Sequence, residues 1–275
     1  MCGHCGCGSD QPVTVIDLQA ETSHGQSQSH AHEHHHHHDH GGEHHHTHVR
    51  SESTVVELNA RILAKNDALA ARNRSWFAGR EILALNLMSA PGAGKTALLE
   101  RTLADLNEDM ALSVIEGDQA GIRDAERIRA AGTPVVQVNT GTGCHLDAAM
   151  VAEGLATLKP TFGSVLFIEN VGNLVCPALF DLGERRRVAI LSVTEGDDKP
   201  IKYPHMFRAA DLLLLNKIDL LEHVDFDADR AEANAREVSP DIQVIRVSAK
   251  TGAGFAAWYD WLTREHALLR DAALP

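Results

Sequence analysis

The stretch Ser89-Ala-Pro-Gly-Ala-Gly-Lys-Thr96 follows the apolar run Ile82–Met88 and precedes the helix-like run Lys95–Leu106. A strand, a glycine-rich loop and a helix in this order are typical of a phosphate-binding P-loop. Lys95 supplies a positive charge for the β- and γ-phosphates, and the Thr96 hydroxyl can ligate Mg²⁺. Backbone N–H groups at the positive end of the helix can face the phosphates. The residues expected to contact the phosphates are Gly92, Ala93, Gly94, Lys95, Thr96 and Ala97.

A second motif, Asn216-Lys-Ile-Asp219, lies directly after the apolar run Leu212–Leu215 and indicates the base. The Asp219 carboxylate can accept both guanine N1–H and N2–H₂, a donor pair that adenine lacks. Ser248-Ala-Lys250 resembles the loop that supports this motif on the guanine side. The residues assigned to the guanine side are Asn216, Lys217, Asp219, Ser248, Ala249 and Lys250. Together the two motifs favour GTP over ATP.

Near-continuous apolar runs alternate with helix-like runs through the second part of the chain. This pattern predicts an α/β fold of the P-loop NTPase class, with a mostly parallel sheet of about seven strands and helices on both faces. Ligands of such sheets bind at the carboxyl ends of the strands, where the P-loop lies. The predicted strands are Ile82–Met88, Ala111–Ile115, Pro134–Val138, Ser164–Ile168, Val188–Val193, Leu212–Leu215 and Ile242–Val247.

Two loops after predicted strands carry acidic residues, in Glu116-Gly-Asp118 and Glu169-Asn-Val-Gly172. An acid followed three residues later by Gly is the spacing at which GTPases hold Mg²⁺ through water and sense the γ-phosphate. We therefore expect Glu169 and Thr96 to serve Mg²⁺, with Gly172 free to turn its amide toward the phosphate. Asp118 can hold Mg²⁺ or orient the attacking water. The predicted catalytic residues are Lys95, Asp118 and Glu169; the alternative is that both acids are solvated loop residues.

The first fifty residues contain most of the histidines and few large apolar side chains. Such a segment cannot bury a core, so residues 1–51 are predicted to be disordered without metal, and residues 52–275 to form the GTPase domain. The run His34–His38 is typical of a store for Ni²⁺, Zn²⁺ or Cu²⁺, which imidazole binds well. An expression tag is the alternative, but the tract is interrupted and lies inside the chain.

Charge and hydropathy exclude several partners. A formal net charge of −13 argues against nucleic acid, which binds basic surfaces. The sequence has neither an apolar run of about 18 residues nor a secretory signal, so we expect no membrane contact and a cytoplasmic location. Thiols stay reduced there, and clustered cysteines are better explained as metal ligands than as disulfides.

Three of the remaining side chains form a second candidate metal site. Cys144 and His145 are predicted to begin the helix His145–Leu158, and Cys176 follows Glu169 by seven residues. Two thiolates and an imidazole suit Zn²⁺ or Ni²⁺, and two copies of the chain could complete the site across a dimer. The alternative is that both cysteines are ordinary small buried residues.

These residues resemble the HypB family of hydrogenase nickel-incorporation GTPases. The likeness covers the chain from about residue 52 onward, together with both features of the tail. The motifs that carry it are Cys2-x-x-Cys5-Gly-Cys7, the histidine tract, Ser89-x-Pro-Gly-x-Gly-Lys-Thr96, Ile115-Glu-Gly-Asp118, Gly143-Cys-His-Leu-Asp147, Glu169-Asn-Val-Gly-Asn-Leu-Val-Cys-Pro177 and Asn216-Lys-Ile-Asp219.

The resemblance implies a fold of the class that includes signal-recognition-particle and MinD-like NTPases. It also implies GTP-dependent homodimerisation, with slow GTP hydrolysis to GDP coupled to delivery of Ni²⁺ into the [NiFe]-hydrogenase large subunit precursor. A HypA-type nickel and zinc protein is the implied partner. In the family pattern Cys2, Cys5 and Cys7 form a tight Ni²⁺ site. Here His4 lies between two of those cysteines and can compete as a ligand, so the identity of the fourth ligand stays open.

Three other functions are weighed against this one. A nickel store could use the nucleotide only for assembly. A sibling GTPase for urease or a cobalamin enzyme would share the nucleotide motifs, but the run Glu169–Pro177 argues against it. A MinD-like ATPase is disfavoured by Asn216-Lys-Ile-Asp219 and by the lack of an amphipathic C-terminal membrane helix.

Overall fold

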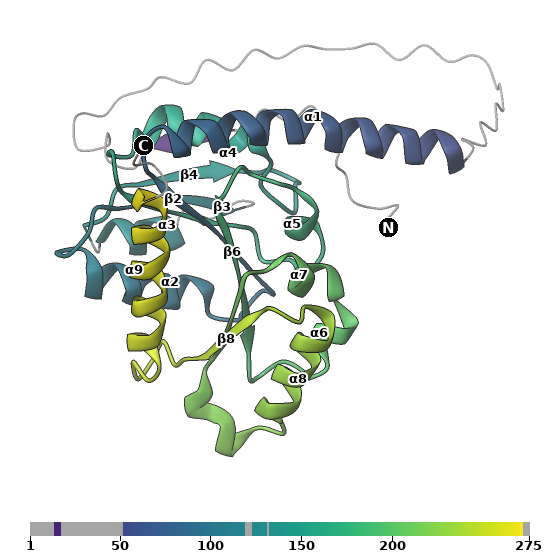
Figure 1. The fold of residues 1–275 in the computed structure, drawn as a ribbon, viewed down its shortest axis with the longest axis vertical. Coiled ribbons are helices and arrows are strands. Elements are labelled where there is room, and N and C mark those ends of the chain that lie inside the picture. Colours follow the sequence, from purple (N-terminus) through teal and green to yellow (C-terminus); the bar gives the residue numbers. More distant parts are fainter. Residues whose placement is uncertain (1–13, 18–51, 119–122, 131, 272–275) are drawn as a thin grey trace, which may run out of the picture.

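The structure is a computed structural model that describes residues 14–17, 52–118, 123–130 and 132–271. These residues form one eight-stranded sheet with the strand order β1-β4-β3-β5-β2-β6-β7-β8, covered by helices on both faces (Figure 1). The α/β prediction is confirmed.

All seven predicted strands are present, and all run parallel. They are β2 (Leu83–Ser89), β3 (Leu112–Asp118), β4 (Val135–Asn139), β5 (Val165–Glu169), β6 (Arg186–Ser192), β7 (Leu212–Asn216) and β8 (Gln243–Arg246). Because the strands are parallel, their carboxyl ends share one edge of the sheet, where all the loops of interest begin.

The eighth strand is β1 (Thr14–Asp17), which pairs antiparallel with β4 at the edge of the sheet. It lies inside residues 1–51, the segment predicted to be disordered, so that prediction is wrong for these four residues. Their run of β-branched side chains, Thr14-Val-Ile16, explains the strand, since such residues suit a half-buried pleated surface. The rest of the segment lies outside the described residues, and the proposed domain boundary stays a prediction.

Ten helices cover the sheet in the described part of the chain: α1 (Glu52–Ala78), α2 (Lys95–Leu106), α3 (Arg123–Ala130), α4 (Ala148–Leu158), α5 (Cys176–Leu179), α6 (Lys199–Lys202), α7 (Pro204–Ala209), the 3₁₀ helix η2 (Ile218–His223), α8 (Ala228–Val238) and α9 (Phe255–Asp271). Within those same residues, none of the helices combines the length and apolarity that crossing a bilayer requires.

One predicted helix boundary is wrong. Helix α4 begins at Ala148 rather than at His145, because the Asp147 side chain caps it by accepting a hydrogen bond from the Met150 amide at 2.8 Å. An Asp at the N-cap satisfies a free amide of the first turn. Cys144 and His145 therefore lie in the loop before the helix.

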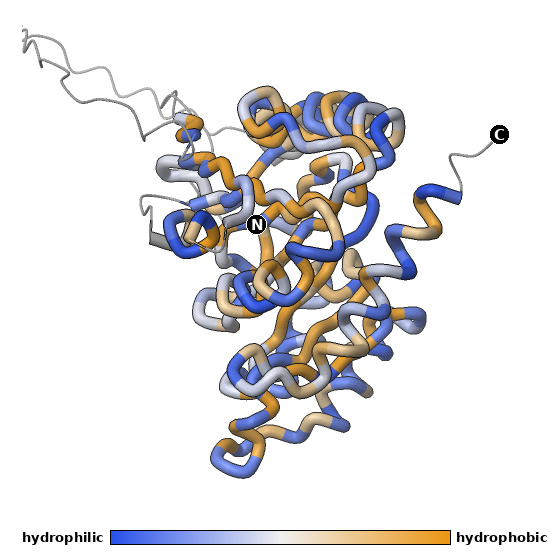
Figure 2. The backbone as a smooth tube through the Cα atoms, turned by 90° about the vertical axis from the view of Figure 1, so that its left-hand side faces the viewer, coloured by the Kyte–Doolittle hydropathy of each residue, from blue (hydrophilic) through white to orange (hydrophobic). Residues whose placement is uncertain are grey.

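The side chains of the central strands alternate between two buried layers. On β2, Leu83, Leu85 and Leu87 pack with α2, α3 and α9, whereas Ala84 and Met88 face the opposite layer. That layer is built by α1 and α4 over one half of the sheet and by α7 and α8 over the other. Hydrophobic strands accordingly run through the middle of the molecule in Figure 2. Burial on both faces fixes the carboxyl edge rigidly beneath the site.

Candidate functional site

The loop between β2 and α2 has the backbone shape of a P-loop. Gly92 and Gly94 adopt the left-handed conformation, with φ of 77° and 91°, and Gly94 is the N-cap of α2. A Cβ on Gly94 would lie 2.6 Å from the Asn216 Nδ2 atom, so only glycine fits there. The first turn of α2 thus points its free amides into the space above the loop.

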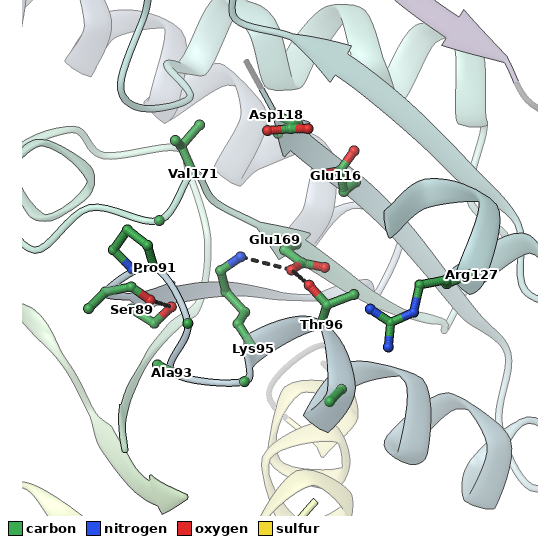
Figure 3. Close-up of a pocket in the computed structure, with 16 residues that line it drawn as sticks. Ser89, Pro91, Ala93, Lys95, Thr96, Glu116, Asp118, Arg127, Glu169 and Val171 are labelled. Atoms are coloured by element: carbon green, nitrogen blue, oxygen red, sulfur yellow. Dashed lines mark hydrogen bonds and ion pairs between the residues drawn. The ribbon is translucent and has the colours of Figure 1, made fainter. Parts of the chain in front are cut away.

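A cavity of about 460 Å³ lies above this loop (Figure 3). Lys95 Nζ lies 2.8 Å from Glu169 Oε1, and the Thr96 hydroxyl donates to the same oxygen at 2.7 Å. Glu169 is nearly fully buried at the end of β5. Two P-loop side chains are therefore held by one carboxylate. The predicted residues that line the cavity are Gly92, Ala93, Gly94, Lys95, Thr96, Ala97, Asp118, Glu169 and Gly172.

The residues of the cavity fit Mg²⁺. Glu169 Oε2 is buried and has no hydrogen-bond partner among the residues that the structure describes. The Thr96 hydroxyl shares the other oxygen of this carboxylate, and Asp118 lines the same cavity. Hard cations such as Mg²⁺ prefer oxygen ligands of this kind.

Two charged residues that line the cavity were not predicted as site residues. Glu116 is 3% exposed and pairs in register with Glu169 across β3 and β5, so two carboxylates stand side by side. Both strands carry the pair Ile-Glu, as Ile115-Glu116 and Ile168-Glu169, but this signal required the strand order. Arg127 of α3 also lines the cavity, and its Nη2 atom lies 2.6 Å from Glu100 Oε2. No motif identified Arg127.

The predicted guanine-side residues form a connected framework. Asn216 Nδ2 donates to the Ala93 carbonyl at 3.0 Å, and Asn216 Oδ1 accepts from the Ala249 amide at 3.2 Å. The Ser248 hydroxyl donates to Asp219 Oδ1 at 2.6 Å. The two guanine-side motifs are thereby joined to each other and to the P-loop.

Two lysines complete this side of the site. Lys217 Nζ donates to the Gly92 carbonyl at 2.7 Å, and Lys217 itself has a φ of 64°. This contact ties the guanine-side motif to the phosphate loop a second time. Lys250 is exposed in the turn that follows Ala249.

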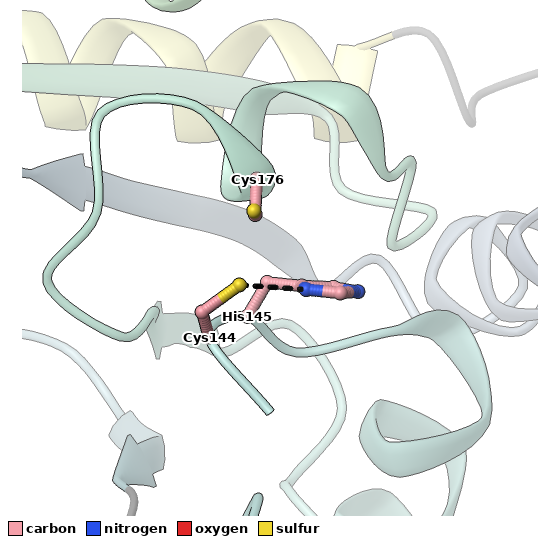
Figure 4. Close-up of side chains that lie close together, drawn as sticks. All are labelled: Cys144, His145 and Cys176. Atoms are coloured by element: carbon pink, nitrogen blue, oxygen red, sulfur yellow. Dashed lines mark hydrogen bonds between the residues drawn. The ribbon is translucent and has the colours of Figure 1, made fainter. Parts of the chain in front are cut away.

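Cys144, His145 and Cys176 converge beside the nucleotide cavity's loops (Figure 4). One ligand atom from each lies within 4.8 Å of the others, and Cys144 Sγ is 3.8 Å from His145 Nδ1. Neither cysteine is part of a disulfide bond. Among the described residues this is the one group of three or more His, Cys, Asp or Glu side chains with such spacing. Cysteine and histidine at this separation can coordinate Zn²⁺ or Ni²⁺.

The position and burial of the His145 ring favour its neutral form. It stacks on Phe180 with a centroid distance of 3.9 Å and an interplanar angle of 26°. Burial lowers the pKa of His145, and the nearby Asp147 carboxylate only partly opposes this. A neutral imidazole is the form that binds metals.

The loop from Glu169 to Cys176 connects the two sites. It starts at the carboxylate that holds Lys95 and ends at a cysteine of the cluster. In between, Gly172 packs on the P-loop so closely that a Cβ would lie 3.1 Å from Pro91 Cα. Cys176 therefore follows the cavity carboxylate Glu169 by seven positions and Gly172 by four. The predicted tail ligands Cys2, Cys5, Cys7 and His34, His35, His36, His37 and His38 lie outside the described residues.

Comparison with known proteins agrees with this geometry. Residues 83–246 match the family model described as CobW/HypB/UreG, nucleotide-binding domain. The hydrogenase maturation factor HypB of Azotobacter vinelandii is 59% identical over 215 residues, which cover 78% of this chain and 71% of that protein. The crystal structure of HypB from Archaeoglobus fulgidus superposes with a TM-score of 0.70 at 41% identity, covering 74% of this chain and 100% of that one.

A nickel complex is among the similar structures. HypB from Helicobacter pylori, solved in complex with nickel, is 35% identical with a TM-score of 0.70 and covers 77% of this chain and 98% of that one. The fold and the cavity define a P-loop NTPase. The chain belongs to the CobW/HypB/UreG family, on its HypB branch.

Proposed function

We propose that this chain is a GTP-hydrolysing metallochaperone that takes part in hydrogenase maturation. It delivers Ni²⁺ to the precursor of a [NiFe]-hydrogenase large subunit in the cytoplasm. The relatives' names as hydrogenase maturation factors support the process, and the nickel complex of the Helicobacter pylori protein supports the cargo.

The nucleotide side acts by binding and orienting GTP. Asp219, braced by Ser248, accepts the guanine N–H groups, while the α2 amides and Lys95 hold the phosphates. Lys95 exchanges its bond with Glu169 for the β/γ-phosphates as the nucleotide enters. Thr96, Glu169 and Asp118 would hold Mg²⁺, which when bound would neutralise charge on the phosphates. Asp118 lines the cavity where it can orient the attacking water, and Gly172 can turn its amide to the γ-phosphate.

The metal side carries the cargo. Cys144, His145 and Cys176 supply three ligands for Ni²⁺, with Zn²⁺ as a competing ion, and a second copy of the chain can complete the site in a GTP-dependent homodimer. The tail, through Cys2, Cys5, Cys7 and the run His34–His38, adds a tight site and a store. A HypA-type nickel and zinc protein is the expected partner in transfer.

One observation carries this proposal: a single loop holds both the carboxylate of the nucleotide site and a ligand of the metal cluster. A change at Glu169 or Gly172 on GTP binding or hydrolysis is transmitted along this loop to Cys176. Linkage then requires that metal alter nucleotide affinity by the same factor.

The test is complementation of a nickel-using bacterium that has both hydrogenase and urease and lacks its own HypB-type gene. Wild-type chain should restore hydrogenase activity, whereas Lys95→Ala and Cys144→Ala should not, and urease should be unchanged by any of them. Lys159→Ala, a lysine at the C-cap of α4 remote from both sites, is the control.

The alternatives give other results. A nickel store would restore maturation in the Lys95→Ala form, and a urease factor would restore urease but not hydrogenase. A MinD-like role requires hydrolysis of ATP in preference to GTP, which a nucleotide competition assay on the full chain measures.

A further inference from the structure

Asn170 is fully buried where two loops meet. The nucleotide loop, residues 170–175, follows β5, and the metal loop, residues 140–147, follows β4 and carries Cys144 and His145. The Asn170 side-chain oxygen accepts hydrogen bonds from the Val171 amide and from the Leu146 amide, each at 3.0 Å. Val171 lines the nucleotide cavity, and Leu146 directly follows His145. One oxygen atom therefore holds one N–H group from each loop.

The rest of the Asn170 residue is anchored to the centre of the sheet. Its backbone amide donates to the Leu87 carbonyl at 3.1 Å, and its Nδ2 atom donates to Asn86 Oδ1 at 3.2 Å. Asn86 in turn donates to Glu184 Oε1 at 3.2 Å, an oxygen that also accepts from Arg187 at 2.6 Å. Asn170, the first residue after β5, is thus anchored to β2 although it begins the loop that leads to Cys176.

Of the two hydrogen bonds to the Asn170 oxygen, the one from Val171 is the one that nucleotide binding can shift. Val171 and Gly172 line the cavity, and Gly172 packs on Pro91, so a triphosphate that draws the Gly172 amide inward also moves the Val171 amide. An amide oxygen offers two lone pairs, and the direction of one accepted bond constrains the other. A shift of Val171 therefore changes how Leu146, and with it His145, is held.

We propose that Asn170 is the positioning residue that couples nucleotide state to the Cys144/His145/Cys176 cluster. This inference rests on the proposed function, because it assumes that the cluster binds metal and the cavity binds GTP. It assigns the coupling to a hydrogen bond across the two loops, in addition to the covalent path along residues 171–176.

Two other buried asparagines provide a matched control, because they bind Ala148, the residue directly after the metal loop, from a different side. Asn66 of α1 accepts from the Ala148 amide at 2.9 Å and donates to the Asp181 carbonyl at 2.8 Å. Asn73 of α1 donates to the Ala148 carbonyl at 2.8 Å. Neither contacts the nucleotide loop, so Asn66→Ala loosens the metal loop without touching the proposed link.

The experiment measures the affinity of the full chain for fluorescent GDP and for a non-hydrolysable GTP analogue, with saturating Ni²⁺ and with a chelator. For each protein, the preference for the GTP analogue over GDP with Ni²⁺ is divided by the same preference with the chelator. Dividing the value for the wild-type chain by the value for full-chain Cys144→Ala gives the coupling factor of the cluster without the contribution of the tail. Reciprocity makes this equal to the effect of nucleotide on metal affinity. Circular dichroism checks that each variant is folded.

We expect the wild-type factor to lie in the range of about 5- to 150-fold that is usual for coupled sites. Asn170→Ala should lower it well below the wild-type value, to the part that the path along residues 171–176 carries. Asn170→Ser, one atom too short to reach Leu146, should do the same and serves if Asn170→Ala does not fold. Asn170→Asp keeps the acceptor oxygen that the Val171 and Leu146 amides share, and it loses only the donor to Asn86, so the folded variant should retain coupling. Asn66→Ala should leave the factor at its wild-type value.

The inference is overturned if the folded Ala and Ser variants keep the wild-type coupling, or if Asn66→Ala abolishes it as fully as Asn170→Ala does. A wild-type chain without any coupling overturns the nickel-switch proposal itself. Coupling that persists in the Asn170 variants removes only the role of this residue.

Discussion

Lys95 Nζ lies 2.8 Å from Glu169 Oε1, so the P-loop lysine and the carboxylate after β5 neutralise one another across the nucleotide cavity. The side chain of Lys95 is 12% exposed and that of Glu169 is 2% exposed, so the pair is well shielded from water. A triphosphate must replace this carboxylate as the partner of Lys95. The pair therefore stabilises the two side chains against each other, and a nucleotide must break it to bind Lys95.

Glu169→Gln should separate the role of Glu169 as the partner of Lys95 from its role in GTP hydrolysis with Mg²⁺. Without the carboxylate, Lys95 is freed, so we expect GDP affinity in the absence of Mg²⁺ to stay equal or to rise a few-fold. GTP hydrolysis should fall by about 10²-fold, as for the loss of one charge-positioning group. Calorimetric titration of GDP and GTP with and without Mg²⁺, with phosphate release, measures both. Glu153→Gln on the exposed side of α4 is the control; equal Mg²⁺ dependence in both variants would contradict the assignment.

Gly94→Ala should disrupt the P-loop more than an ordinary strained glycine substitution does. The added Cβ would lie 2.6 Å from Asn216 Nδ2, on a residue with φ of 91°, so both backbone strain and a clash arise. Gly163→Ala shares the positive φ, 69°, but has open space around the new Cβ. We expect the control to lose about 1–2 kcal/mol of unfolding free energy from strain alone. The Gly94 variant should lose more and should also lose nucleotide binding; equal losses in urea titrations would refute this.

Asp219→Asn should change the base that is bound. The carboxylate accepts two guanine N–H groups, whereas the amide of Asn can donate to the 2-carbonyl that xanthine carries in place of the amino group. GTP binding should weaken by at least about 100-fold, since a buried unpaired donor pair costs several kcal/mol, and XTP binding should improve. Competition between the two nucleotides measures the switch. Because Ser248 donates to Asp219 at 2.6 Å, Ser248→Ala should weaken GTP binding without favouring XTP.

The Arg74–Asp181 pair should make stability depend on acid pH. Two bonds of 2.7 Å join α1 to the segment after α5. Burial by itself raises the pKa of Asp181, but the hydrogen bonds from Arg74 and Gly183 outweigh it, so the folded pKa lies below the ordinary value. A carboxyl group with a lowered folded pKa stabilises the fold above its unfolded pKa, about 3.9, and loses that contribution as pH falls through the folded pKa.

Urea unfolding of wild type and Asp181→Asn from pH 7 to pH 3 tests this. The difference in unfolding free energy should be constant above about pH 5 and shrink as pH drops below about 4. Asp260→Asn, an exposed aspartate on α9, should show no such convergence. A difference that stays constant down to pH 3 would show that the pair does not titrate as proposed.

The parts predicted from sequence are those with local physical signals. The P-loop, the seven parallel strands and the guanine-side motifs each combine a spacing rule with an apolar strand before it. The helix α4 was placed three residues early, because its true cap is Asp147 and the apolar periodicity does not show a cap. Helix α5 was missed because four residues, Cys176–Leu179, are too few to show a helical period.

The parts that sequence could not provide depend on which strands are neighbours. Glu116 joins the cavity only because β3 lies beside β5, and Asn170 gains its two bonds only because Leu146 approaches it from another loop. An Asn directly after a strand can make several kinds of local hydrogen bond, so finding Asn at position 170 does not predict a bond to another loop. Strand β1 was not predicted for a related reason, because a strand of four residues is stable only when it pairs with β4.

The direction of β1 divides the N-terminal segment into two arms with separate anchor points. Thr14 pairs with Asn139 at the carboxyl edge of the sheet, and Asp17 pairs with Val136 toward the opposite edge. Thr14 therefore lies at the edge that carries the nucleotide cavity and the Cys144/His145/Cys176 cluster, and a chain of thirteen residues spans at most about 45 Å. If the proposed cysteine site exchanges an ion with the cluster, the step can occur within one chain, so its rate would be first order in protein and indifferent to dilution.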